Sequence, residues 1–137
     1  MSHYSQIKSI MKRKSSLIKA LQKIDNGRWK NAVEVPEEAT NLYGYQGDKR
    51  EQKADIIIRR KHVGGSSNDI GFKQREDGTF EAIISDYDSS RHDSSWLDRL
   101  TQQYACETVK EVAYENGYSV TEEEVNGEIF LTCETAF

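Results

Sequence analysis

The sequence lacks the features that would indicate a membrane anchor, a disulfide framework or a zinc site. Only two of its 137 residues are cysteine, Cys106 and Cys133, and they have no CxxC or histidine spacing. We interpret them as buried thiols or a fortuitous pair. No apolar run approaches the roughly 20 residues that a membrane helix requires. The apolar residues of the basic N-terminus are periodic, unlike those of a signal peptide. A cytoplasmic protein is therefore expected.

The motifs of common enzyme classes are also missing. The sequence contains no GxxxxGK[ST], no GxGxxG and no GxSxG. Neither cysteine has a neighbouring histidine or basic cluster that would activate it as a nucleophile. His3 and His62 stand alone in polar surroundings, so we interpret both as surface residues. We expect no catalytic residues, no cofactor and no metal.

One acidic loop resembles a metal or acid–base site most closely. It contains Asp86, Asp88, His92 and Asp93, and carboxylates with an imidazole can bind a divalent ion or transfer protons. However, the loop lacks the spacing and the terminal glutamate of a calcium loop. Because loops rich in Asp and Ser before a helix usually form turns and caps, we favour a structural loop.

Charge is distributed unevenly along a chain whose length fits one domain, residues 1–137. The net charge is -4, yet residues 1–30 carry a balance of +7 and residues 92–137 a balance of -8. Such a dipole suggests oriented contact with another molecule or with a second copy of the chain. The alternative is that two helices simply have solvated faces.

The N-terminal segment has the period of an amphipathic helix. Apolar residues recur at three- and four-residue steps from Ser5 to Ile24, which predicts one helix over this range. Asp25-Asn26-Gly27 would end it with a left-handed residue. A basic stripe runs nearly opposite the apolar face, with Arg13 beside it: Lys8, Lys12, Lys19 and Lys23.

The middle of the chain predicts several strands and a hairpin. Short strands are expected at Trp29–Val35, Asn41–Tyr45 and Ala54–Arg60, with a polar loop at Gln46–Lys53. Two alternating segments, Asp69–Arg75 and Thr79–Ser85, flank Glu76-Asp77-Gly78. Because Asp-Gly is a strong two-residue turn signal, these segments predict an antiparallel hairpin.

The C-terminal third predicts a helix followed by a second hairpin. Ser95 can cap the helix, with Asp98 completing a capping box, and Asn116-Gly117 ends it. The hairpin combines Tyr118–Val125 and Glu128–Glu134 around Asn126-Gly127.

The order of these elements predicts an α+β fold: a mainly antiparallel sheet of about five to six strands, with two amphipathic helices packed on one face. The other face requires polar residues, which the following side chains would supply: Arg59, Lys73, Glu81, Glu122 and Glu124.

Four blocks, in order along nearly the whole chain, resemble the hypothetical chloroplast reading frame thirty-five family of plastid and cyanobacterial genomes. They are Met1–Lys8; Tyr43–Gly47 with Ala54–Ile58; Asp69–Phe72 with Ser85–Tyr87; and Trp96-Leu97, Gln103–Ala105 and Gly117–Val120. The chain departs from the family at Pro36–Thr40, at Gly64–Asn68 and in the acidic loop. Members are expected beside AAA-type ATPase genes in bacteria and phages, so the resemblance implies an accessory or adaptor role by analogy.

We therefore expect a non-catalytic protein that works through protein contacts, with an ATPase or a second copy as partner and no membrane. The residues expected to bind the partner are Lys8, Lys12, Arg13, Lys19, Lys23, Glu122, Glu123 and Glu124. Reversing the charge of the four lysines should then leave the fold intact. The alternative is nucleic-acid binding, with the same lysines on phosphates and with Trp29, Tyr43 and Tyr45 stacked on bases. The acidic pI of about 5.4 argues against it.

Overall fold

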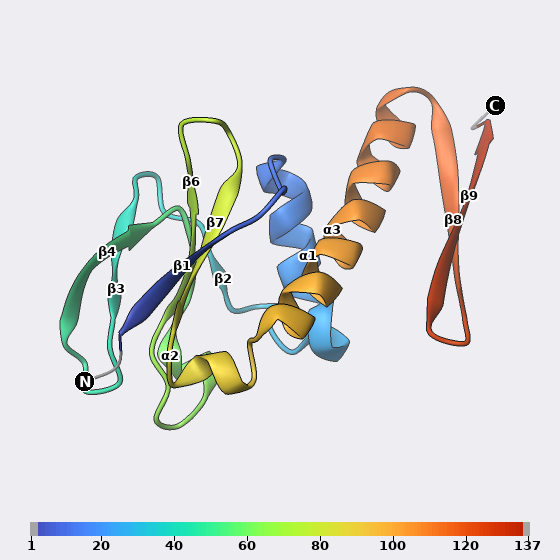
Figure 1. Cartoon of the computed structure of the whole chain (residues 1–137). Coiled ribbons are helices and arrows are strands. Elements are labelled where there is room, and N and C mark those ends of the chain that lie inside the picture. Colours follow the sequence, from blue (N-terminus) through green and yellow to red (C-terminus); the bar gives the residue numbers. More distant parts are fainter. Residues whose placement is uncertain (1–2, 136–137) are drawn as a thin grey trace.

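The fold is built on a five-stranded antiparallel sheet. A computed structural model describes residues 3–135, so Met1, Ser2, Ala136 and Phe137 lie outside the described residues. The strands lie in the order β1-β7-β6-β5-β2 (Figure 1). Their bounds are β1 Tyr4–Lys8, β2 Val33–Glu34, β5 Ile56–Ile58, β6 Ile70–Gln74 and β7 Phe80–Ser85. This architecture confirms the predicted α+β class.

The predicted Asp-Gly hairpin forms the centre of this sheet. Phe72 of β6 lies opposite Ala82 of β7, and Gly78 takes a φ of +88° in the turn. Asp77 accepts hydrogen bonds from the Thr79 amide (2.9 Å) and hydroxyl (2.6 Å). Turn chemistry and side-chain alternation therefore select the same register.

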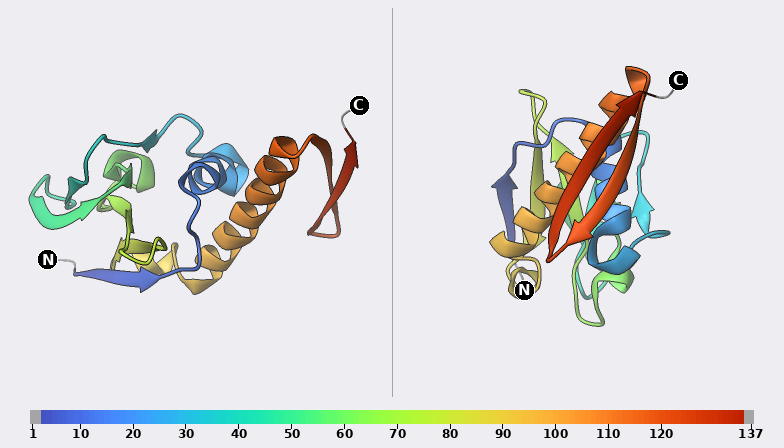
Figure 2. Two further views of the ribbon diagram at one scale, coloured as in Figure 1. Left: turned by 90° about the horizontal axis from the view of Figure 1, so that it is seen from above. Right: turned by 90° about the vertical axis from the view of Figure 1, so that its right-hand side faces the viewer.

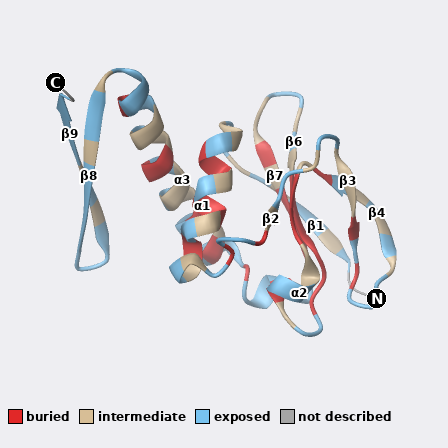
Figure 3. Cartoon of the chain, turned by 180° about the vertical axis from the view of Figure 1, so that it is seen from behind, coloured by how far each residue is buried: buried red, intermediate tan, exposed pale blue. Residues whose placement is uncertain are grey.

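Two helices cover one face of the sheet, as the sequence predicts. They are α1 (Lys14–Gly27) and α3 (Ser94–Glu115), and Figure 1 shows them side by side. Leu17, Leu21, Trp96 and Leu100 pack from the helices onto Phe72 and its neighbours in the main hydrophobic core. The buried residues gather between helices and sheet, as Figure 3 shows in red. Burial of these apolar side chains is the main stabilising contribution.

The opposite face of the sheet is covered rather than polar. A hairpin of β3 (Thr40–Tyr43) and β4 (Lys49–Ala54) lies over it and buries a second cluster: Leu42, Ala54, Ile57 and Ile83. The approach is close, because a Cβ on Gly71 would lie 2.6 Å from the Ala54 Cβ. The predicted polar loop Gln46–Lys53 is therefore wrong over most of its length. Alternate side chains of β4 face solvent, which suits a charged edge strand.

The N-terminal prediction of one helix from Ser5 to Ile24 is also wrong. Tyr4–Lys8 forms β1, which pairs with β7 so that Lys8 lies opposite Glu81. The helix begins only at Lys14. The two residues before it are held by α3, because the Tyr104 hydroxyl accepts hydrogen bonds from Lys12 N (3.0 Å) and Arg13 N (2.9 Å). The helix stops where expected, with positive φ at Asp25, Asn26 and Gly27.

Smaller differences concern the ends of elements. The expected strand Trp29–Val35 shrinks to β2, and Ala54–Arg60 divides into the end of β4, β5 and the one-turn helix α2 (Arg60–Val63). The N-cap of α3 is Asp93 rather than Ser95, and its carboxylate accepts from the Trp96 amide at 2.9 Å. Either residue satisfies the capping pattern locally.

The last hairpin forms as predicted but lies outside the main sheet. The strands β8 (Tyr118–Val125) and β9 (Glu128–Thr135) make a separate two-stranded ribbon that extends from the end of α3 (Figure 2). We call this ribbon the hairpin arm. Glu122 and Glu124 lie on it and not on the polar face of the main sheet. None of the helices in residues 3–135 is long and apolar enough to cross a membrane.

Candidate functional site

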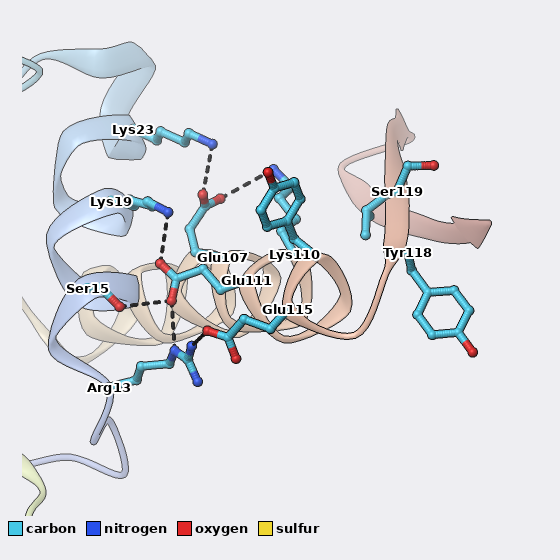
Figure 4. Close-up of a pocket in the computed structure, with 12 residues that line it drawn as sticks. Arg13, Ser15, Lys19, Lys23, Glu107, Lys110, Glu111, Glu115, Tyr118 and Ser119 are labelled. Carbon is cyan, nitrogen blue, oxygen red and sulfur yellow. Dashed lines mark hydrogen bonds and ion pairs between the residues drawn. The ribbon is translucent and has the colours of Figure 1, made fainter. Parts of the chain in front are cut away.

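A groove between α1, α3 and the start of β8 gathers much of the charge of the molecule (Figure 4). It encloses about 840 Å³ and is lined by Arg13, Ser15, Lys19 and Lys23 on one wall and by Glu107, Lys110, Glu111 and Glu115 of α3 on the other, with Tyr118 at its end. We call it the ion-pair groove. It combines residues from both the basic and the acidic end of the sequence.

Glu111 is at the centre of the ion-pair groove. Its side chain is 10% exposed and lies 2.9 Å from Lys19 Nζ. Arg13 Nε donates to its carboxylate at 2.7 Å, and the hydroxyls of Ser15 and Ser16 donate at 2.8 and 3.0 Å. Arg13 also contacts Glu115. Burial opposes ionisation, but these donors outweigh it and lower the pKa of Glu111 from 4.5 to about 2.

Glu107 forms a second centre one turn earlier on α3. Its side chain is 2% exposed. Lys23 Nζ donates to it at 2.8 Å and Gln103 Nε2 at 3.0 Å, and Lys110 Nζ lies at 3.4 Å. Burial alone would raise the pKa of Glu107, but the hydrogen bonds from Lys23 and Gln103 and the charge of Lys110 lower it. Carboxylates that are paired with cations and have low pKa values are poor proton acceptors, which favours a structural role for this network.

The structure separates the residues expected to bind a partner into three groups. Arg13, Lys19 and Lys23 enter ion pairs with α3, and Lys8 and Lys12 lie exposed in β1 and in the segment before α1. The stripe of four lysines on one helix therefore does not exist. The three glutamates lie on the hairpin arm, where Glu122 pairs with Lys110 at 2.9 Å. Several basic residues of the N-terminal part thus form ion pairs with acidic residues of the C-terminal part in the same chain.

The ion-pair groove was missed from the sequence although a signal was present. Glu107, Glu111 and Glu115 recur every four residues, as do Lys19 and Lys23. Residues four apart share one face of a helix. Two complementary stripes at the same spacing therefore indicate that two helices pack against each other through their charges.

The hairpin arm is the second feature of the region. Every residue of β8 and β9 is exposed or only partly buried. Phe130 is 50% exposed, and Glu123, Glu124, Glu128 and Glu134 enter no ion pair within residues 3–135. Next to the arm, an apolar groove of about 480 Å³ runs along α3 and is lined by Thr108, Val109, Val112, Ala113, Asn116 and Tyr118.

The acidic loop before α3 is held by buried hydrogen bonds and ring contacts. Asp88, 4% exposed, accepts hydrogen bonds from the Ser85 hydroxyl (2.7 Å) and the Asn68 amide (3.0 Å). His92 stacks on Trp29 at 5.5 Å and meets Trp96 edge-on at 4.8 Å. Burial lowers the pKa of His92, which keeps it neutral. Among the described residues no group of three or more His, Cys, Asp or Glu can hold a metal ion.

The remaining aromatic and cysteine predictions have mixed outcomes. Trp29 is 1% exposed and donates its indole N–H to the His62 carbonyl at 3.0 Å, so it presents no stacking surface. Tyr43 and Tyr45 remain exposed. Cys106 is buried and Cys133 exposed, and both are free.

The sequence was compared with known families and proteins. The family described as "Protein of unknown function (DUF1257)" matches residues 31–131. The "Uncharacterized protein ycf35" of Cyanophora paradoxa is 30% identical over 125 residues, which cover 90% of this chain and 88% of that protein. No solved structure gives a significant match. These findings confirm the resemblance to the chloroplast reading frame family, and the chain belongs to the DUF1257 family of proteins of unknown function.

Proposed function

We propose that this is a cytoplasmic, non-catalytic accessory protein that binds a partner protein through the hairpin arm and the adjoining face of α3. The observation that carries this proposal is the lack of burial on the arm: its residues, unlike those of the main sheet, have no core to join. A two-stranded hairpin alone is marginally stable in water. Packing against a partner would supply the missing burial.

The arm has apolar surface for such packing. Tyr118, Val125 and Phe130 are each at least 42% exposed on the arm, and Val109 and Val112 are about as exposed on α3. Within the chain the arm packs through β8 on α3, while β9 lies on the outer side (Figure 2). Exposed apolar residues that cluster next to a groove are typical of interaction surfaces.

The charge of the arm specifies the kind of partner. Residues 118–137 contain five glutamates and no basic residue, and four of these glutamates have no ion pair within residues 3–135. A partner surface that combines basic residues with an apolar anchor would complement both features. The ion-pair groove holds α3 at a fixed position on α1, so the arm is presented on a rigid support.

The partner class that we propose is an AAA-type ATPase, for which the protein would act as an adaptor or assembly factor. This choice rests on the analogy with the family that the sequence resembles, and the arm is compatible with it. A second copy of the chain would offer exposed Lys8 and Lys12 as the basic surface instead. Nucleic-acid binding through the N-terminal helix has less support, because Lys19 and Lys23 already neutralise carboxylates.

The experiment is a quantitative pull-down from the native host after nuclease treatment, with three tagged proteins. The first is the wild type. The second reverses the arm: Glu123→Lys, Glu124→Lys and Glu128→Lys. The third is a matched control that reverses three exposed carboxylates elsewhere: Glu37→Lys, Glu51→Lys and Glu76→Lys. An ATPase that the wild type and the control retain, and that the arm variant loses, is the expected result.

Purified components then distinguish the alternatives. Reconstitution with the captured ATPase should show one complex that weakens with salt and fails with the arm variant. Sedimentation of the purified chain alone tests self-association, and a stable dimer broken by the arm variant would identify the partner as a second copy. Equal capture by all three proteins would contradict a role for the arm.

A further inference from the structure

A second surface, at the end of the sheet where α2 lies (Figure 1), is built from cations, glycines and tyrosines. One depression of about 670 Å³ is lined by Arg59, Arg60, Lys61, Gly64 and Tyr43 among others. A smaller one of about 190 Å³ is also lined by the Gly64-Gly65 loop, together with Ser66, Ser67, Tyr87, Asp88 and Arg91 among others. The two depressions share both glycines.

The cations of this surface differ in how they are used. The charge of Arg59 is already paired, because its guanidinium donates to Asp69 at 2.8 Å and to Glu34 at 2.9 Å. By contrast, Arg60, Lys61 and Arg91 enter no ion pair within residues 3–135. Arg60 is nonetheless held in place, since its Nη1 donates to the Tyr45 carbonyl at 2.8 Å. Three positive charges are therefore available to an anion.

Glycines lie beside two of these cations, and a third glycine faces open space. A Cβ on Gly47 would lie 3.9 Å from Arg60 Nη2, and a Cβ on Gly64 would lie 4.0 Å from Arg91 Nη1 and 2.7 Å from Ser67 Oγ. At Gly65 a Cβ would meet no atom within 4 Å. A ligand can therefore approach the backbone of this loop closely at Gly65, which lines both depressions.

A buried polar network fixes the surface from below. Asp69, 1% exposed, accepts from the amides of Tyr43 (2.8 Å) and Arg60 (2.7 Å). The fully buried Asn68 accepts from the Tyr45 amide at 2.9 Å. Buried charges of this kind contribute little net stability compared with apolar residues, but they hold loops in one arrangement. Functional surfaces require such pre-organisation.

An exposed aromatic ring lines each depression. Tyr43, 37% exposed, lines the larger depression and carries the Arg59 guanidinium over its ring, 5.6 Å from the centroid; Tyr87, 56% exposed, lines the smaller depression. Cationic side chains that alternate with exposed rings are the elements with which proteins bind single strands: the cations contact phosphates and the rings stack on bases.

We propose that the surface formed by Tyr43, Arg60, Lys61, the Gly64-Gly65 loop, Tyr87 and Arg91 binds single-stranded nucleic acid. Phosphates would lie over the glycine loop between the cations, and a base would stack on each tyrosine. The overall acidity of the chain does not oppose this, because the five glutamates of residues 118–137 account for more than the net charge of -4 and lie on the arm at the far side of the molecule (Figure 1). The site is independent of the arm and of the proposed protein partner.

Binding of a labelled short oligothymidylate, as DNA and as RNA, tests the proposal by fluorescence anisotropy. The variant Lys61→Ala/Arg91→Ala should weaken binding by about tenfold or more, with a smaller salt slope. The control Lys12→Ala/Lys53→Ala removes two exposed lysines that line neither depression, and it should change affinity by less than about twofold. Tyr87→Leu should weaken binding by about fivefold or more, because stacking is lost.

Amide NMR spectra locate the ligand and separate its sources. The oligonucleotide should shift the amides of Gly47 and Gly64, which lie next to the Arg60 and Arg91 guanidinium groups, and the amide of Gly65, which lines both depressions. If ADP shifts the same amides and no oligonucleotide binds, the site takes a free nucleotide and the single-strand proposal is overturned. No binding by the folded wild type, or equal weakening by the control, overturns the site altogether.

Discussion

The body of the molecule, residues 3–117, and its hairpin arm differ in how far their side chains are buried. In the body, two helices and a covering hairpin enclose both faces of the sheet, and side chains such as Phe72 and Leu100 are fully buried. In the arm, which has equally regular strand pairing, no residue is buried. Regular hydrogen bonding is thus no sign of a core. The body is stabilised by its own hydrophobic core, whereas the arm leaves its side chains exposed or only partly buried.

The two regions also differ in the surroundings of their carboxylates. The body places carboxylates such as Asp69 and Glu107 out of water and satisfies them with several donors. The arm leaves four of its glutamates in solvent with no ion pair in the described part of the chain. Removal of a polar partner should therefore destabilise the body strongly and the arm hardly at all.

The largest effect is expected at Asp69. Asp69→Ala would leave the Arg59 guanidinium and the amides of Tyr43 and Arg60 without their acceptor. We expect a loss of roughly 3 to 5 kcal/mol in the free energy of unfolding, measured with urea. Glu34→Ala removes the exposed partner of the same arginine and should cost at most about 1 kcal/mol. Similar losses in the two variants would refute the central role of Asp69.

The next effect concerns the ion-pair groove. Lys19→Glu/Lys23→Glu places carboxylates beside Glu111 and Glu107, and we expect a loss of roughly 2 to 4 kcal/mol. Both ammonium groups are about half exposed, which keeps the effect below that of fully buried pairs.

The matched control is Lys8→Glu/Lys12→Glu, which should cost less than about 1 kcal/mol, chiefly because position 8 lies opposite Glu81. The sequence alone predicts that all four reversals leave the fold intact, whereas the ion pairs of Lys19 and Lys23 lead us to expect this for the control pair only. If both double variants unfold at the same urea concentration, the pairing across α1 and α3 does not stabilise the body.

A smaller effect should appear in the pH dependence of stability. The pKa of Glu111 is lowered from 4.5 to about 2 on folding. Its contribution is therefore complete above pH 4.5 and is lost as the pH falls toward 2. Urea titrations of the wild type should show stability falling over this interval, and Glu111→Gln should flatten that fall. An unchanged pH profile in the variant would show that Glu111 is not held ionised by its donors.

The smallest effect is expected on the arm. Phe130→Ala should change the free energy of unfolding by less than about 0.5 kcal/mol, because half of the side chain is already in water. Phe72→Ala, the matched change in the core, should cost roughly 3 to 5 kcal/mol. The order should reverse for partner capture, which Phe130→Ala should reduce. A large loss of stability in Phe130→Ala would mean that the arm belongs to the core.

The sequence predicts elements well where the signal is local. The hairpin around Asp77-Gly78, the end of α1 at Gly27 and the extent of α3 all follow from turn chemistry and periodicity. It fails where distant residues decide. Tyr4–Lys8 is a strand because β7 is available to pair with it some 75 residues later. The charged segment Lys49–Ala54 pairs with the adjacent β3, and its end at Ala54 packs on the sheet beside Ile57 and Ile83.

The candidate site shows the same division. The basic and acidic excesses of the two ends were visible in the sequence, but their pairing across α1 and α3 required the tertiary arrangement of the helices. Tyr43, Arg60 and Arg91 lie far apart in the sequence and share no regular spacing, so no local pattern predicts that they line one surface. In the folded chain, Asn68 and Asp69 accept hydrogen bonds from the amides of Tyr45 and Arg60. These bonds fix the loops that line the two depressions.

Native-state hydrogen exchange tests the contrast between body and arm most directly. Amides of β6 and β7 should exchange only by global unfolding, whereas those of β8 and β9 should exchange about a hundredfold faster or more through local opening. Bound partner should slow exchange in the arm and leave the body unchanged. Equal protection of both hairpins in the free protein would contradict the account, because the arm would then be as stable as the core without a partner.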